Sequence, residues 1–266
     1  MYPASREPSG FPGYPASTAL APDRVTFLRK VYLLMTGAVG VSALTAAFAC
    51  LAGASTPRAI GHGLAVPPLV GLFLEHPFLS LILLLGGTFG ASAVARRPGL
   101  NVAALFGLSA VIGLVIAPAI YFAQLRASTG DTLSSAPVLH AFALAVTGFV
   151  GLSTYAIVSK RDFSTLRGFL TMGLFVVIGA SVLNLFFGGQ VFALAIASVV
   201  VLLFGGFVLY DTSRMLREGD NQPVVAALGL YLNFLNIFLA LLRIFGSGRR
   251  NSLTSASITG QRSRIM

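Results

Sequence analysis

The residue in this sequence best placed to do chemistry is Asp211, which follows the apolar run ALAIASVVVLLFGGFVLY and precedes Arg214 by three positions. The other seven acidic residues fall in the N-terminal tail or in and beside the predicted loops. An ionised carboxylate costs about 2.5 to 3.5 kcal/mol at the centre of a bilayer and less near the interface, so it should face protein or water. We expect either an ion or proton site at Asp211 or an interfacial i,i+3 pair with Arg214.

Other polar residues lie in or beside the apolar stretches. Asn233 and Asn236 lie in the stretch 223 to 245, and Asn184 lies in the stretch 166 to 188. Buried amides join membrane helices at about 0.6 to 2 kcal/mol each, which is the preferred interpretation of Asn184 and Asn236, whereas Asn233 is as well explained by ligand binding. Arg96 and Arg97 should lie at the same membrane depth as Asp211 and are candidate counter-charges.

Signatures of enzymes are missing from the sequence. It contains no GxSxG, no HExxH, no phosphate-binding loop and no Cys or His cluster at metal-ligand spacing. We therefore predict a protein that is not an enzyme and that carries no cofactor.

The composition is that of an integral membrane protein. Of the 266 residues, 56% are hydrophobic and 10% are charged, and the mean hydropathy is +0.86, which no ordinary soluble domain approaches. The net charge of +10 does not indicate nucleic-acid binding, because the basic residues separate apolar runs instead of forming one basic surface. The partner that the sequence predicts is the lipid bilayer.

Seven stretches have the length of about 20 apolar residues that a helix needs to cross the hydrocarbon. They are residues 31 to 52, 71 to 94, 101 to 123, 137 to 159, 166 to 188, 192 to 213 and 223 to 245. Backbone polar groups in lipid must be satisfied within each segment, so we predict an all-α bundle of seven transmembrane helices. Gly86 and Gly90 form a GxxxG, which predicts close packing of the second helix against a neighbour.

The basic residues predict the orientation of the chain. Eleven lie in the N-terminal tail and in every second loop, against two in the other loops, which places the N-terminus in the cytoplasm. Five further arginines at the C-terminal end then require either that the first six helices dominate the topology or that the seventh re-enters on one side. Because the seventh segment contains two asparagines and Arg243, we expect it inside the bundle in both cases.

The predicted organisation has three parts. Residues 1 to 24 contain five prolines and a repeated YPAS and form a disordered cytoplasmic tail. Residues 25 to 246 form the seven-helix membrane domain, and residues 247 to 266 form a basic C-terminal tail. Sixteen of the eighteen basic residues are arginine, which is typical of a GC-rich bacterial genome.

Three segments resemble the Bax inhibitor-1, or transmembrane Bax inhibitor motif, family. They are SKRDFSTLRGFLTMGLFVVIGASVLNLFF, GFVLYDTSRML and AALGLYLNFLNIFLALLRIFG, and the resemblance covers residues 27 to 246. It implies six helices around a central seventh, and a bacterial inner membrane location. It also implies one of two functions: a regulated calcium leak, or a non-conducting regulator that binds a membrane-bound AAA protease.

In leak-type members of that family an aspartate on the sixth helix and another on the seventh share a proton and latch the pore, and an arginine of the second helix can replace one link. Carried onto this chain, the resemblance assigns the first aspartate to Asp211, which could also contact a metal ion, and the arginine to Arg96 or Arg97. Asn233 takes the place of the second aspartate. An amide cannot repel Asp211, so we predict a hydrogen bond between Asp211 and Asn233 and a weaker pH response than in a member with two aspartates.

Overall fold

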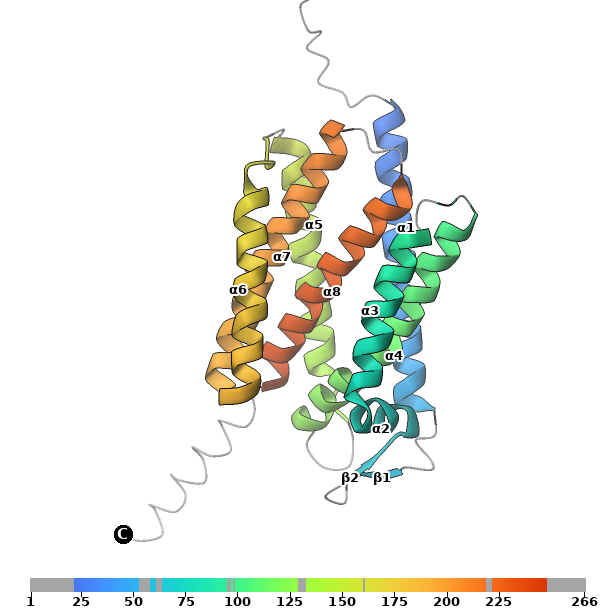
Figure 1. The fold of residues 1–266 in the computed structure, drawn as a ribbon, viewed down its shortest axis with the longest axis vertical. Helices are drawn as coiled ribbons and strands as arrows, with labels where there is room; N and C mark the ends of the chain where they lie inside the picture. Colours follow the sequence, from blue (N-terminus) through green and yellow to red (C-terminus); the bar gives the residue numbers. More distant parts are fainter. Residues whose placement is uncertain are drawn as a thin grey trace, which may run out of the picture.

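The computed structural model of this chain describes residues 22–52, 58–60, 64–94, 97, 99–128, 133–159, 161–218 and 222–247. These residues form a helical bundle with a short antiparallel hairpin at one end (Figure 1). The elements are α1 (Pro22–Leu51), β1 (Arg58–Ile60), β2 (Leu64–Val66), α2 (Pro68–Glu75), α3 (Pro77–Val94), α4 (Leu100–Ala127), α5 (Ala136–Ser159), α6 (Leu166–Phe187), α7 (Gln190–Glu218) and α8 (Pro223–Ser247). The hairpin was not predicted, because three-residue strands are too short to show an alternating pattern.

Seven of these helices, α1 and α3 to α8, are long and apolar enough to cross a membrane. They match the seven predicted segments in order, which confirms the all-α membrane bundle. Helix α1 begins at Pro22, so residues 22 to 24 of the predicted tail are helical. Proline suits the first position of a helix, where its missing N–H has no intrahelical partner to lose. The rest of the N-terminal tail and all but the first residue of the C-terminal tail lie outside the described residues.

The second predicted segment, residues 71 to 94, is two helices and not one. Helix α2 ends at Glu75, and α3 begins two residues later at Pro77. His76 between them has φ −121° and ψ 68°, outside the helical region. The proline ring clashes with a helical conformation of the preceding residue, so the chain turns at His76 and only Pro77–Val94 crosses the bundle.

The seventh membrane helix, α8, is the centre of the bundle, as predicted. In its most apolar stretch 72% of the residues are buried, against 6 to 33% in the other six membrane helices. It packs against α1, α4, α5 and α7, and Figure 1 shows it crossing diagonally between them. Asn233 on α8 is therefore enclosed by protein, which removes the cost of exposing it to lipid, whereas Arg243 near the end of the helix is exposed.

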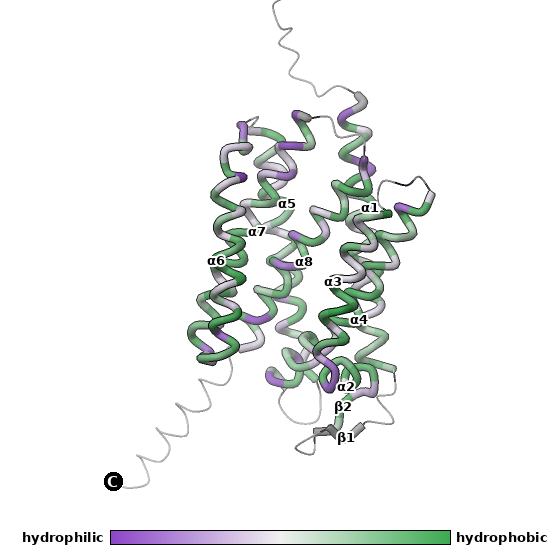
Figure 2. Tube along the Cα trace, in the orientation of Figure 1, coloured by the Kyte–Doolittle hydropathy of each residue, from purple (hydrophilic) through white to green (hydrophobic). Residues whose placement is uncertain are grey.

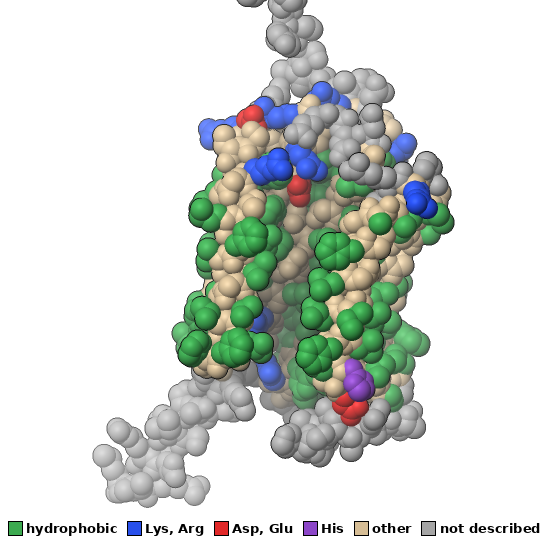
Figure 3. Space-filling view, in the orientation of Figure 1, with side chains coloured by type: hydrophobic (Ala, Val, Ile, Leu, Met, Phe, Trp, Pro, Cys, Tyr) green, Lys and Arg blue, Asp and Glu red, His purple; other side chains and the backbone are tan. Residues whose placement is uncertain are grey.

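Helix α8 also crosses the whole bundle. Its first residue lies at the end where α1 begins, which we call the N-terminal end, and Ser247 lies at the opposite, C-terminal end (Figure 1). The seventh segment thus passes through and does not re-enter. Figure 2 shows hydrophilic positions gathered near the helix ends and along α8, and Figure 3 shows hydrophobic side chains over the sides of the bundle and many basic ones at the N-terminal end.

The tightest helix packing at a glycine occurs away from the predicted pair. A Cβ atom added at Gly86 or Gly90 would meet nothing within 4 Å. A Cβ atom at Gly113 of α4 would overlap the Thr45 hydroxyl and the Ser42 carbonyl of α1. The absence of a side chain at Gly113 is what lets α1 and α4 approach each other.

Candidate functional site

Asp211 and Asn233 join α7 to the central helix near the N-terminal end of the bundle. The Asn233 amide Nδ2 donates a hydrogen bond of 2.7 Å to Asp211 Oδ2. Asn233 is 7% exposed, and Asp211 is half-buried. An amide donor matches a carboxylate acceptor, and hydrogen bonds to a charged group are about twice as strong as neutral ones. The contact that the sequence suggested between these two residues is therefore present.

A glycine on α8 gives the carboxylate its space. Gly229 lies four residues before Asn233, so both face α7 on the same side of the helix. A Cβ atom at Gly229 would lie 3.7 Å from Asp211 Oδ2. The central helix thus presents a small residue and a donor, one turn apart, to one carboxylate.

The counter-charge nearest to Asp211 in the sequence lies on the same helix. Arg214 acts on Asp211 by Coulombic attraction, and its Cζ also lies 6.0 Å from the centre of the Tyr210 ring. Asp211 therefore has a hydrogen-bond donor on α8 and a positive charge on α7, so both interpretations made from the sequence remain physically compatible.

The two arginines expected from the second membrane helix have different outcomes. Arg96 lies outside the described residues. Arg97 is exposed in the link between α3 and α4, where its backbone N–H donates to Val94 O at 2.8 Å. Within the described part of the chain, no hydrogen bond or ion pair joins the Arg97 side chain to Asp211. An exchange of Asp211 between Asn233 and an arginine stays a prediction.

The surroundings of Asp211 offer few ligands for a tightly bound metal ion. Among the residues that the structure describes, no group of three or more His, Cys, Asp or Glu side chains converges. Calcium takes six to eight oxygen ligands, and Asp211 with one amide supplies only part of such a set. Asp211 alone could therefore contact a passing, largely hydrated cation.

The end of α7 that carries Asp211 is held on two sides. The Arg24 guanidinium of α1 donates to the Leu216 carbonyl. On the other side, Ser213 Oγ donates to the Arg161 carbonyl at 3.3 Å and accepts from Phe163 N at 3.5 Å, and Arg217 pairs with Asp162 at 3.2 Å. These contacts fix α7 to α1 and to the link between α5 and α6.

Sequence reasoning missed a second polar contact of the central helix. Tyr231 and Ser42 are both buried, and their hydroxyl oxygens lie 2.5 Å apart. The signal was a tyrosine two positions before Asn233 in an otherwise apolar stretch, but its partner, 189 positions away, could not be read from the sequence.

Comparisons with known proteins identify the relatives of this chain. A model of the family described as "Inhibitor of apoptosis-promoting Bax1" matches residues 24–250. Protein lifeguard 4 of Mus musculus is 31% identical over 87% of this chain and 94% of its own. YccA of Escherichia coli K12, named a modulator of FtsH protease, is 30% identical over 84% of this chain and 91% of its own.

An uncharacterised membrane protein of Vibrio cholerae is 46% identical over 121 residues, so the chain spans about half the length of that relative: 45% of this chain aligns with 54% of the Vibrio protein. The match to the family extends over nearly all of the membrane domain, including the helices that carry Asp211 and Asn233. This chain belongs to the Bax inhibitor-1 family.

Proposed function

We propose that this protein is a regulated cation leak of a bacterial inner membrane, latched by the hydrogen bond between Asp211 and Asn233. The observation that carries the proposal is the bond itself, which ties the enclosed central helix to α7 through the one carboxylate within a described membrane helix interior. A carboxylate attracts hard cations such as calcium, and breaking its bond to Asn233 removes a polar link between α7 and α8, which also pack against each other.

The proposed orientation places the N-terminal end, with Asp211, at the cytoplasm. It rests on the excess of basic residues in the N-terminal tail and in alternate loops. The inner membrane location is supported by the bacterial relative YccA, which is also named an inner membrane protein. Because α8 crosses the bundle, the C-terminal tail then leaves on the outer side.

Flux through reconstituted vesicles tests the leak. Purified native protein and Asp211→Ala are compared for efflux of calcium, potassium and protons, at equal incorporation. We expect altered cation flux in Asp211→Ala, because both the latch and the attracting charge are lost. Asp162→Ala is the control, since it removes an exposed acid from the same end of the bundle without touching α8. Equal flux in the native protein and Asp211→Ala contradicts the leak.

A second candidate function is regulation of a membrane-bound protease without ion conduction. It is supported by YccA, whose name describes a modulator of FtsH protease. Gly86 and Gly90 of α3 have open space beside them, which leaves a small-residue face for a helix of another protein. Partner binding should then survive Asp211→Ala and fail in Gly86→Leu/Gly90→Leu or after removal of residues 1 to 21. Co-purification from bacterial membranes measures this, and loss of the partner in Asp211→Ala argues against it.

A further inference from the structure

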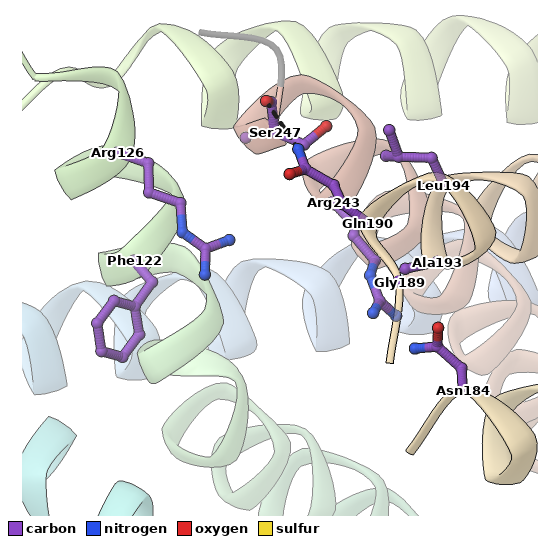
Figure 4. Close-up of a pocket in the computed structure, with 10 residues that line it drawn as sticks. Phe122, Arg126, Asn184, Gly189, Gln190, Ala193, Leu194, Arg243 and Ser247 are labelled. Carbon is purple, nitrogen blue, oxygen red and sulfur yellow. Dashed lines mark hydrogen bonds between the residues drawn. The ribbon is translucent and has the colours of Figure 1, made fainter. Parts of the chain in front are cut away.

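A cavity of about 590 Å³ lies at the C-terminal end of the bundle, at the opposite end from Asp211. It is bordered by the last turns of α4 and α8 and by the junction of α6 and α7. Figure 4 shows its polar side chains, and Arg126 reaches from α4 toward the space that Arg243 and Gln190 also border. The lining residues come from segments far apart in the sequence, so no sequence motif predicts the cavity.

The charges in this cavity are all of one sign. Arg126 and Arg243 line it, and none of its described lining residues is acidic. Neither guanidinium has a hydrogen-bond or ion-pair partner among the described residues, and both are exposed near the ends of their helices. Two cations in one cavity repel each other, and an anion between them would replace this repulsion with attraction.

Uncharged polar groups complete the lining. Gln190 Nε2 donates to the Ser247 carbonyl at 3.3 Å, which closes the cavity beside the end of α8. Asn184 also borders the cavity; its buried Oδ1, which has no partner in the described structure, can only accept a hydrogen bond, so its Nδ2 is the group that would donate to an anion. The first turn of α7 also borders the cavity through Gln190 and Ala193; the Ala193 N–H is taken by the Gly189 carbonyl, at 2.9 Å, but the positive end of the helix dipole favours an anion.

We propose that this cavity binds a phosphate group, held between Arg126 and Arg243 and contacted by Asn184. The planar guanidinium presents paired donors that match phosphate oxygens, and two of them can hold one phosphate from opposite sides. The volume exceeds that of a phosphate ion and admits a phospholipid headgroup. Exposed apolar residues on the adjoining turn, Phe187 and Val191, lie where acyl chains would pass. Free phosphate and the headgroup of an anionic phospholipid share the required chemistry.

The test is direct binding by the purified full-length protein, independent of any ion flux. Inorganic phosphate is titrated by calorimetry in a neutral detergent. Retention of phosphatidylglycerol against phosphatidylcholine is measured by native mass spectrometry. Arg126→Gln and Arg243→Gln should each weaken phosphate binding about tenfold, as expected for the loss of one charged hydrogen-bonding group. Asn184→Leu should weaken it less.

The control is Arg29→Gln/Arg167→Gln, which removes two exposed charges at the opposite, N-terminal end of the bundle and leaves the lining side chains intact. Its binding should stay within about twofold of the native value, because general attraction between charges is screened by salt. Arg126→Lys and Arg243→Lys keep the charge and lose the paired donors, so they remain informative if the glutamine variants fail to assemble. They should show intermediate affinity.

The two sources of phosphate give different results. Binding of both probes, with phosphate displacing the lipid, assigns one site to both, and retention of phosphatidylglycerol without binding of free phosphate assigns it to the headgroup. Binding of free phosphate with no lipid preference assigns it to the soluble ion. The proposal is overturned if the native protein binds neither probe, or if Arg29→Gln/Arg167→Gln weakens binding as much as the lining variants do.

Discussion

The hydroxyl oxygens of Tyr231 on the central helix and Ser42 on α1 lie 2.5 Å apart in the closed interior of the bundle. Ser42 Oγ is also within reach of the carbonyl oxygens of Ser109, at 2.9 Å, and Ala38, at 3.0 Å. Tyr231 can therefore donate to Ser42 while Ser42 donates to a carbonyl, which links α8, α1 and α4 through polar groups shielded from water and lipid.

Replacing Tyr231 with phenylalanine should lower the free energy of unfolding by about 1 to 2 kcal/mol, because the Ser42 oxygen loses its buried partner. The matched control is Tyr32→Phe. The Tyr32 hydroxyl is buried and has no hydrogen-bond partner among the described residues, so its removal should be neutral or stabilising. Thermal unfolding in detergent compares the two variants, and equal effects would show that the Tyr231 bond contributes nothing.

Asn233→Leu and Asn236→Leu form a second matched pair. The Asn233 side chain bonds to Asp211 on another helix, whereas Asn236 Nδ2 donates to the Leu232 carbonyl of its own helix at 2.8 Å. We expect Asn233→Leu to destabilise the protein by about 1.5 to 3 kcal/mol, because a partly buried carboxylate loses its donor, and to increase leak. Asn236→Leu should change the stability and the leak little. Vesicle efflux and chemical unfolding measure the pair, and a larger effect of Asn236→Leu contradicts the latch.

Asn233→Asp tests the proposed pH response. Two carboxylates at this separation cannot both be charged at low cost, so the variant should bind a shared proton whose loss separates α7 from α8. The native amide cannot take part in such sharing. Calcium efflux measured against pH should therefore be steeper in Asn233→Asp than in the native protein. Equal steepness would refute the assignment of Asn233 as the latch partner.

Asp162, in the link between α5 and α6, should make a small pH-dependent contribution to stability. The Ser164 backbone N–H, which donates to Asp162 Oδ1 at 2.9 Å, lowers the pKa of this carboxyl below its usual value, with help from the Ser164 hydroxyl and the Arg217 charge. A lowered pKa in the folded state means that the stabilisation is present above the unfolded pKa and is lost as pH falls through the folded one.

Asp162→Asn should therefore be slightly less stable than the native protein at neutral pH and equal to it in strong acid. Unfolding midpoints measured at several pH values below 5 check this convergence. A difference between the two proteins that persists undiminished at low pH would assign the effect to something other than ionisation of Asp162.

Gly113→Ala should disturb assembly, whereas Gly107→Ala on the same helix should not. The added methyl group at Gly113 overlaps the α1 backbone at Ser42, but at Gly107 it meets nothing within 4 Å. We expect a loss of at least about 1 to 3 kcal/mol in the first variant, as for overpacking, and a gain of up to about 1 kcal/mol in helix propensity in the second. Thermal unfolding in detergent compares the two variants. If Gly113→Ala is as stable as the native protein, α1 can move away from α4 without cost.

Much of the fold could be predicted because lipid imposes few solutions. Long apolar runs define the membrane helices, and asparagines with Arg243 in the last run identify the helix that protein must enclose. Pro77 in the sequence is a signal for a helix break at His76, but the high hydrophobicity of residues 71 to 94 favoured the prediction of one continuous helix. Contact between Asp211 and Asn233 was expected only through resemblance, since spacing along the chain does not determine which helix faces meet.

Other features depend on the packing of distant segments and were beyond sequence reasoning. Gly86 and Gly90 have the GxxxG spacing that is typical of a contact between helices, yet an added Cβ atom would meet nothing there. The tightest approach between two helices is at Gly113, which has no glycine four residues before or after it. Arg126 and Arg243 looked like unrelated residues near helix ends. Only the crossing angle of α8 brings their side chains to one cavity.

The bond from Arg24 to the Leu216 carbonyl has a mechanical consequence. Arg24 is two residues from the start of α1, and Leu216 is little more than one turn beyond Asp211. A pull on the chain ahead of Pro22 would therefore act on the helix that carries Asp211 as well as on α1. Force applied to this part of the chain would therefore act on the proposed latch, which would connect the two proposed functions.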